Sequence, residues 1–122
     1  TVHAPSLPET RRMIGREQLA LMRDDAVLIN TARGALVDTD ALVDELASGR
    51  LRAVLDVTDP EPLPPGHPLF TLPGVILTPH VAGSLGNELR RIGSSVVDEV
   101  ERYVTSDELA GEVTSPDLAK IA

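Results

Sequence analysis

The stretch Asn30-Thr31-Ala32-Arg33-Gly34 places an arginine directly after a short apolar run. That run, residues 26–29, is continuous and bounded by polar residues, a pattern typical of a strand buried on both faces of a sheet. Open α/β sheets bind ligands in the crevice beyond the carboxyl ends of their strands. Arginine offers a rigid fork of donors that can bind a carboxylate through two bonds. Arg33 is therefore a candidate site residue, and a loop arginine satisfied by its neighbours is the equally weighted alternative.

The alternation of strand and helix patterns continues along the chain. Apolar runs at residues 53–57 and 75–78 predict two further buried strands. Between the first two strands, helical spacing predicts a helix that is capped by Asp38 or Thr39 and stops at Gly49. Another helix is predicted from Ser84 to about residue 104. Since strand–helix–strand units of about 30 residues are right-handed crossovers, we predict a three-layer α/β fold whose parallel strands follow the sequence order.

Composition narrows the class of protein. The chain has 122 residues, of which 42% are hydrophobic and 25% charged, ordinary values for one modest globular domain. The net charge of −8 argues against nucleic-acid and anionic membrane partners. No cysteine is present, so disulfides and thiolate metal sites are excluded; we predict no metal site and a cytoplasmic location. No apolar stretch approaches the roughly 20 residues of a membrane helix.

Chemically useful side chains follow all three predicted strands. Arg33 and His80 stand just after the first and third strands, Asp56 stands at the end of the second, and Glu61 lies five residues beyond Asp56 in a proline-rich loop. Because parallel strands deliver their carboxyl ends to one edge, we expect an anion-binding group, two carboxylates and an imidazole to meet there. Each residue alone has a plainer explanation, as a loop histidine, a solvated carboxylate or an aspartate bonded to backbone amides. Their joint placement favours a site.

Three segments together resemble the D-isomer-specific 2-hydroxyacid dehydrogenases. They are Asn30-Thr31-Ala32-Arg33-Gly34, Leu55-Asp56-Val57 with Glu61-Pro62, and Thr78-Pro79-His80-Val81-Ala82-Gly83. The resemblance implies that residues 1–104 are the C-terminal part of a Rossmann-like NAD(P)-binding domain and that residues 105–122 are a tail returning towards a substrate domain. The G-x-G-x-x-G turn that opens such a domain does not occur in this sequence. We therefore expect a partial chain, inactive alone because its pyrophosphate site is missing.

The resemblance also implies residue roles. Arg33 would hold the substrate carboxylate or carbonyl, His80 would be the general acid/base, and Glu61 would bond to His80 and favour its charged form. The implied cofactor-binding residues are Ala4, Pro5, Thr31, Ala32, Arg33, Asp56, His80 and Gly83, with Asp56 holding the carboxamide. The implied cofactor is NAD or NADP, the substrate a small 2-keto or 2-hydroxy acid, and the intact protein a homodimer. Thr58 stands where many members carry an aromatic residue, which leaves the substrate open.

Three alternatives stay open at this point. A related dehydrogenase could act on another small anion, such as phosphite. A nucleotide-sensing relative could serve as a corepressor that binds NAD(H) without turnover. A split product could fold only with a partner. The intact catalytic set, Arg33, Glu61 and His80, favours the enzyme.

Overall fold

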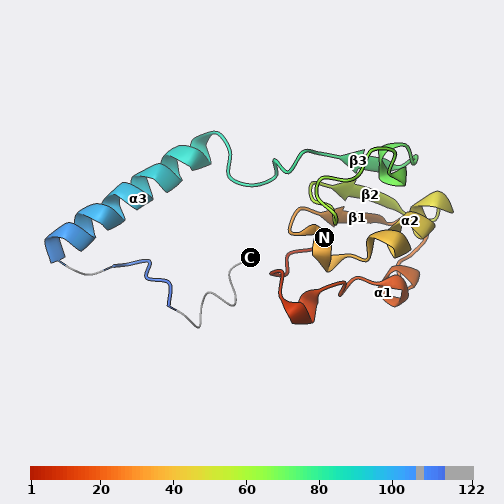
Figure 1. Cartoon of the computed structure of the whole chain (residues 1–122), viewed down its shortest axis with the longest axis horizontal. Helices are drawn as coiled ribbons and strands as arrows, with labels where there is room; N and C mark the ends of the chain where they lie inside the picture. The colour runs from red at the N-terminus through yellow and green to blue at the C-terminus, as the bar shows by residue number, and fades with distance from the viewer. Residues whose placement is uncertain (107–108, 115–122) are drawn as a thin grey trace. The chain divides into compact units, whose positions relative to one another are not determined.

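The computed structural model describes residues 1–106 and 109–114, which form two compact units. The first unit is Thr1–Val81 and contains the sheet; the second contains the helix α3 (Asn87–Ser106) (Figure 1). Most of the predicted tail, residues 105–122, lies outside the described residues. None of the helices in the described ranges is both long enough and apolar enough to cross a membrane.

A parallel sheet forms the centre of the first unit. Its strands are β1 (Val27–Asn30), β2 (Arg52–Leu55) and β3 (Val75–Leu77), in the order β1-β2-β3. Asn30 is opposite Leu55, and Leu55 is opposite Leu77. On the outer side of β1, Val2 forms a parallel bridge with Asn30. The predicted parallel sheet with sequential strand order is thus confirmed, and four chain segments leave it at one edge.

Short helices connect the strands. The α-helices are α1 (Arg16–Ala20) and α2 (Thr39–Ala47), and the 3-10 turns are η1 (Pro8–Thr10), η2 (Gly34–Leu36) and η3 (Pro68–Phe70). α2 begins after Asp38, whose side chain accepts a hydrogen bond from the Ala41 N–H at 3.1 Å. It ends before Gly49, whose φ of 76° is the left-handed conformation that favours glycine at this position. Both predicted boundaries are confirmed.

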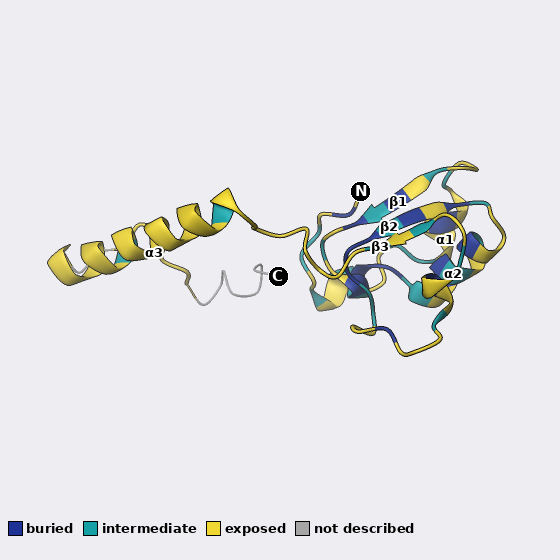
Figure 2. Cartoon of the chain, turned by 90° about the horizontal axis from the view of Figure 1, so that it is seen from above, coloured by how far each residue is buried: buried dark blue, intermediate teal, exposed yellow. Residues whose placement is uncertain are grey.

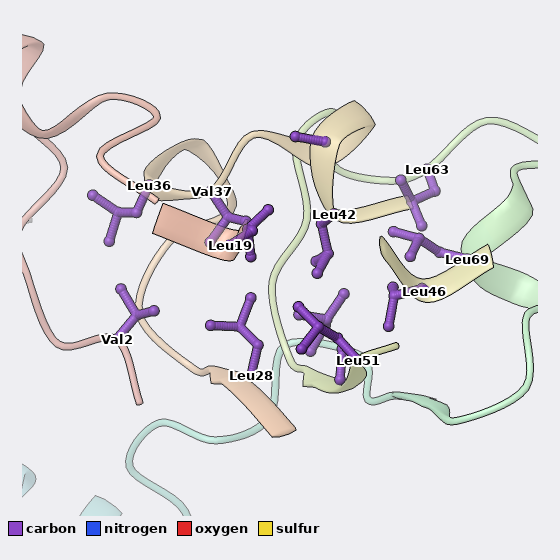
Figure 3. Close-up of a cluster of buried hydrophobic side chains, with 13 residues drawn as sticks. Val2, Leu19, Leu28, Leu36, Val37, Leu42, Leu46, Leu51, Leu63 and Leu69 are labelled. Atoms are coloured by element: carbon purple, nitrogen blue, oxygen red, sulfur yellow. The ribbon is translucent and has the colours of Figure 1, made fainter. Parts of the chain in front are cut away.

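The core lies between one face of the sheet and the two α-helices. Leu19 from α1 and Leu42 and Leu46 from α2 pack with Leu28 of the sheet (Figure 3). Leu55 of the sheet belongs to the same cluster. All five side chains are buried, and burying one leucine contributes about 1.5–3 kcal/mol relative to leaving it exposed. The core is aliphatic, as a sequence with one Phe, one Tyr and no Trp requires.

The opposite face of the sheet is more accessible. Burial alternates along β1 and β2, and Val27 and Ile76 on this second face are 42% and 59% exposed. Within Thr1–Val81, both α-helices cover the same face, so the prediction of strands buried on both faces is wrong for this unit. Figure 2 shows the contrast between buried and exposed positions along the strands.

The helix of the second unit begins later than the sequence predicts. α3 starts at Asn87, and Ser84 is not its N-cap, because Gly86 has a left-handed φ of 57° that a helix cannot include. The helix is amphipathic, with exposed apolar side chains at helical spacing: Leu89, Ile92, Val96, Val100 and Tyr103. Figure 2 shows that α3 is exposed along nearly its whole length.

Candidate active site

The carboxyl ends of the strands bring most of the predicted site residues to one edge of the sheet. Arg33 follows β1, Asp56 follows β2 and His80 follows β3, and these strands are paired in parallel. Ala4 and Pro5 follow the Val2 bridge at the same edge. Thr31 and Ala32 stand between β1 and Arg33. Gly83, the remaining predicted cofactor residue, belongs to the second unit, and its role stays a prediction.

The loop that carries Arg33 is held by the side chain of Asn30. Asn30 is 1% exposed; its Nδ2 donates to the Arg33 carbonyl at 2.9 Å, and its Oδ1 accepts from the Ala32 N–H at 3.1 Å. The exposed Arg33 side chain donates through Nη1 to the Ala32 carbonyl at 2.8 Å and makes no other hydrogen bond to the described residues. The rest of the guanidinium fork can therefore bind an anion. Sequence reasoning missed the role of Asn30, although a polar residue ending a buried strand was a usable signal.

Gly34 allows the Arg33 loop to pack closely against the loop that leads to Glu61. A Cβ at Gly34 would lie 2.0 Å from the backbone carbon and oxygen of Thr58, so only glycine fits there. Nearby, the Thr39 hydroxyl donates to the Asp59 carbonyl at 2.8 Å. The two loops are thus fixed to each other through backbone contact.

Asp56 joins the end of β2 to the segment around His80. It is 3% exposed, and its Oδ1 accepts hydrogen bonds from the Thr78 hydroxyl and from the Val81 N–H, the latter at 2.9 Å. Its predicted contact with the cofactor carboxamide stays a prediction. Thr78 was part of the recognised motif, but the sequence does not reveal that its hydroxyl binds a carboxylate 22 positions earlier.

His80 and Glu61 form a direct pair. The distance between His80 Nδ1 and Glu61 Oε1 is 2.8 Å, and the two side chains are 48% and 41% exposed. The predicted contact between these residues is confirmed, while their catalytic roles stay predictions. An ionised Glu61 carboxylate can only accept, so Nδ1 carries a hydrogen and donates a hydrogen bond to it. Nε2 is then the nitrogen that can exchange a proton with a ligand.

A pocket of about 510 Å³ adjoins this pair. Asp56, Glu61 and His80 contribute polar groups to its lining, and most of the remaining wall is apolar: Pro62, Leu63, Phe70, Leu77 and Pro79. A concave, mostly apolar wall with a few convergent polar groups is typical of small-molecule sites. In the described ranges, no group of three or more His, Asp and Glu residues is placed to hold a metal ion.

A second polar cluster lies away from the site and is structural. Arg50 donates through Nε to Glu45 at 2.7 Å and through Nη1 and Nη2 to the carbonyls of Met22 and Leu19 at the end of α1. The hydrogen bond from Arg50 lowers the pKa of Glu45 and raises that of Arg50. This cluster ties α1 to the end of α2.

Comparisons with known proteins agree with this geometry. Residues 1–82 match the family model for the D-isomer specific 2-hydroxyacid dehydrogenase, NAD binding domain. D-3-phosphoglycerate dehydrogenase from Methanocaldococcus jannaschii is 40% identical over 119 residues, which cover 97% of this chain and 22% of that protein.

Two solved structures are also similar. The TT0316 protein from Thermus thermophilus is 47% identical, with a TM-score of 0.83 over 92% of this chain and 36% of that chain. A D-isomer specific 2-hydroxyacid dehydrogenase from Xanthobacter autotrophicus, in complex with NADPH and MES, is 37% identical, with a TM-score of 0.78 over 93% of this chain and 46% of that chain. The chain thus spans less than half the length of each of these three relatives. It belongs to the D-isomer-specific 2-hydroxyacid dehydrogenase family, and its first 82 residues match that family's NAD binding domain.

Proposed function

We propose that the protein containing this chain is an NAD(P)-dependent oxidoreductase that interconverts small 2-keto acids and 2-hydroxy acids. The observation that carries the proposal is the 2.8 Å contact between His80 and Glu61, at the sheet edge that also receives the Arg33 loop. Reduction of a keto acid needs a positive anchor for its carboxylate and a proton donor for its carbonyl oxygen, and these residues have those properties.

The residues at this edge fit the nicotinamide end of a dinucleotide. An exposed guanidinium, an imidazole whose Nε2 has no hydrogen bond to the described residues, and a pocket of about 510 Å³ share the edge where parallel α/β sheets bind their ligands. When bound, the dinucleotide would supply the hydride. The residues that would line its nicotinamide end are Ala4, Pro5, Thr31, Ala32, Asp56 and Gly83.

Three residues of the chain would bind the substrate and transfer the proton. Arg33 would exchange its hydrogen bond to the Ala32 carbonyl for the substrate carboxylate, which it can bind through two parallel bonds. His80 would donate its Nε2 proton to the carbonyl oxygen during reduction and remove that proton during oxidation. Glu61 would accept a hydrogen bond from Nδ1, which orients the ring so that Nε2 faces the ligand.

The cofactor and the assembly belong to the same proposal. NAD and NADP both remain candidates; the relative from Xanthobacter autotrophicus was solved with NADPH.

We propose that the complete protein is a cytoplasmic homodimer. The absence of cysteine supports the location, and the exposed apolar side chains on the second face of the sheet support association with further protein surface. Light scattering of the complete protein measures the assembly, and a monomeric mass would contradict it.

The experiment is turnover of a panel of 2-keto acids by the complete protein with NADH and with NADPH. We expect reduction of at least one member and a loss of about 10²–10⁴-fold in kcat for His80→Ala. His67→Ala is the matched control, since His67 bonds the Leu69 N–H in η3 and takes no part in the site. Dinucleotide binding without turnover of any keto acid would contradict the proposal and favour a nucleotide-sensing protein.

A further inference from the structure

We infer that Thr78 is a positioning residue: together with Asp56, it forms a clamp that holds the backbone of His80 where the imidazole meets Glu61. The catalytic part of this inference rests on the proposed function. The clamp itself consists of Asp56 Oδ1 and two groups that donate to it, the Thr78 hydroxyl and the Val81 N–H.

The two donors lie on either side of His80. Thr78 precedes it by two residues, and Val81 follows it directly, so a single carboxylate oxygen holds both ends of the segment. The backbone around them is also fixed, because the Thr78 N–H donates to the Leu55 carbonyl and the His80 N–H donates to the Thr78 carbonyl, each at 3.0 Å. The backbone of His80 is therefore tied to the ends of β2 and β3.

The backbone of His80 has an unusual conformation that needs contacts such as the clamp to maintain it. His80 has a φ of 52°, in the left-handed region that residues with a Cβ rarely adopt. Such a conformation persists only where surrounding contacts enforce it, and these outliers cluster at functional sites. The contacts to Asp56 stand on both sides of His80 and are among those that hold it in this conformation.

Because the Asp56 carboxylate is buried, it needs the hydrogen bond that the Thr78 hydroxyl donates. Asp56 is 3% exposed, and a buried carboxylate must keep its hydrogen-bond donors. Thr78 is an exposed residue at the end of β3, so its side chain is not required to fill the core. Removing its hydroxyl takes one donor from Asp56 and removes one of the contacts that hold the His80 segment, while the apolar core is left intact.

The test compares two substitutions of one residue in the complete protein. Thr78→Val keeps the shape and removes the hydroxyl, whereas Thr78→Ser keeps the hydroxyl. We expect Thr78→Val to lower kcat for keto-acid reduction by about 10–100-fold, because displacement of a catalytic group by about 1 Å costs about 10²-fold. KM for the dinucleotide should change less than kcat, and Thr78→Ser should stay within about threefold of wild type.

The free energy of unfolding separates positioning from general loss of structure. We expect the fall in kcat of Thr78→Val to exceed what any loss of folded protein explains, and we expect Thr78→Ser to stay near wild type in both quantities. Thr71→Val is the matched control, because the Thr71 hydroxyl bonds the Pro68 carbonyl outside the site. Equal kcat values for Thr78→Val and wild type would overturn the inference. Thr78→Ala repeats the comparison if Thr78→Val does not fold.

Nuclear magnetic resonance of the imidazole keeps the two proposals distinguishable. If the wild-type protein turns over no keto acid, the proposed function fails, and the clamp is still tested by the chemical shifts of the His80 ring signals at one pH. We expect these chemical shifts to change in Thr78→Val and to stay in place in Thr78→Ser and Thr71→Val. Unchanged chemical shifts in Thr78→Val would overturn the clamp.

Discussion

Gly34→Ala should separate two loops that meet in the candidate active site. Gly34 is buried, and a Cβ placed on it lies 2.0 Å from the carbonyl carbon and oxygen of Thr58 and 2.6 Å from the Asp59 nitrogen. All three neighbours are backbone atoms, so no flexible side chain can move aside. The loop of Arg33 and the loop leading to Glu61 must therefore move apart.

The size of the effect follows from these distances. Carbon atoms reach favourable contact at roughly 3.5–4.0 Å, so the two loops must separate by roughly 1.5 Å. Overpacking of this kind costs about 1–3 kcal/mol of stability. A displacement of about 1 Å at a catalytic site lowers the rate by about 10²-fold. We expect both effects, with the loss of activity exceeding what the loss of folded protein explains.

The assay is kcat/KM for keto-acid reduction, measured with the free energy of unfolding in urea on the same preparations of the complete protein. Gly93→Ala is the matched control, because it makes the same chemical change inside α3, where a Cβ has open space. We expect the control to be neutral or slightly stabilising, since alanine favours a helix over glycine. Wild-type kcat/KM and wild-type stability for Gly34→Ala would refute the close packing of the two loops.

Other substitutions test single contacts. Arg33→Lys keeps the charge but loses the planar fork, so transition-state binding should weaken by about 2–4 kcal/mol with nearly unchanged NADH affinity; wild-type turnover would remove Arg33 from the site. Glu61→Gln keeps the shape but replaces the carboxylate that pairs with His80 Nδ1, so kcat for keto-acid reduction should fall; an unchanged kcat would mean that Glu61 does not orient the imidazole. The hydrogen bond from Arg50 lowers the pKa of Glu45 from 4.5, so its stabilisation is present above pH 4.5 and is lost as pH falls through the lowered pKa. In urea unfolding, Glu45→Gln should therefore be less stable than wild type at pH 7 and approach it in acid, and a difference that persists in acid would contradict this.

Much of the candidate site was predictable because the topology of a parallel sheet is itself predictable. Once three strands alternate with helices, their carboxyl ends must share an edge, and Arg33, Asp56 and His80 follow those ends. The contact between Glu61 and His80 came from the family resemblance, because the two residues are 19 positions apart and carry no local signal of the contact.

The sequence by itself determined the local features of the fold. Apolar runs and helical spacing placed the strands and α2, and the Asp38 cap and the Gly49 stop marked the ends of that helix, because a cap and its partner are only a few residues apart. Tertiary structure decided which face of the sheet is covered, since strand periodicity does not say where the helices pack. It also decided that Asp56 holds the His80 segment and that Gly34 touches Thr58. A hydrogen bond or a backbone contact between residues more than 20 positions apart depends on how the strands are arranged in space, and neither residue type reveals it alone.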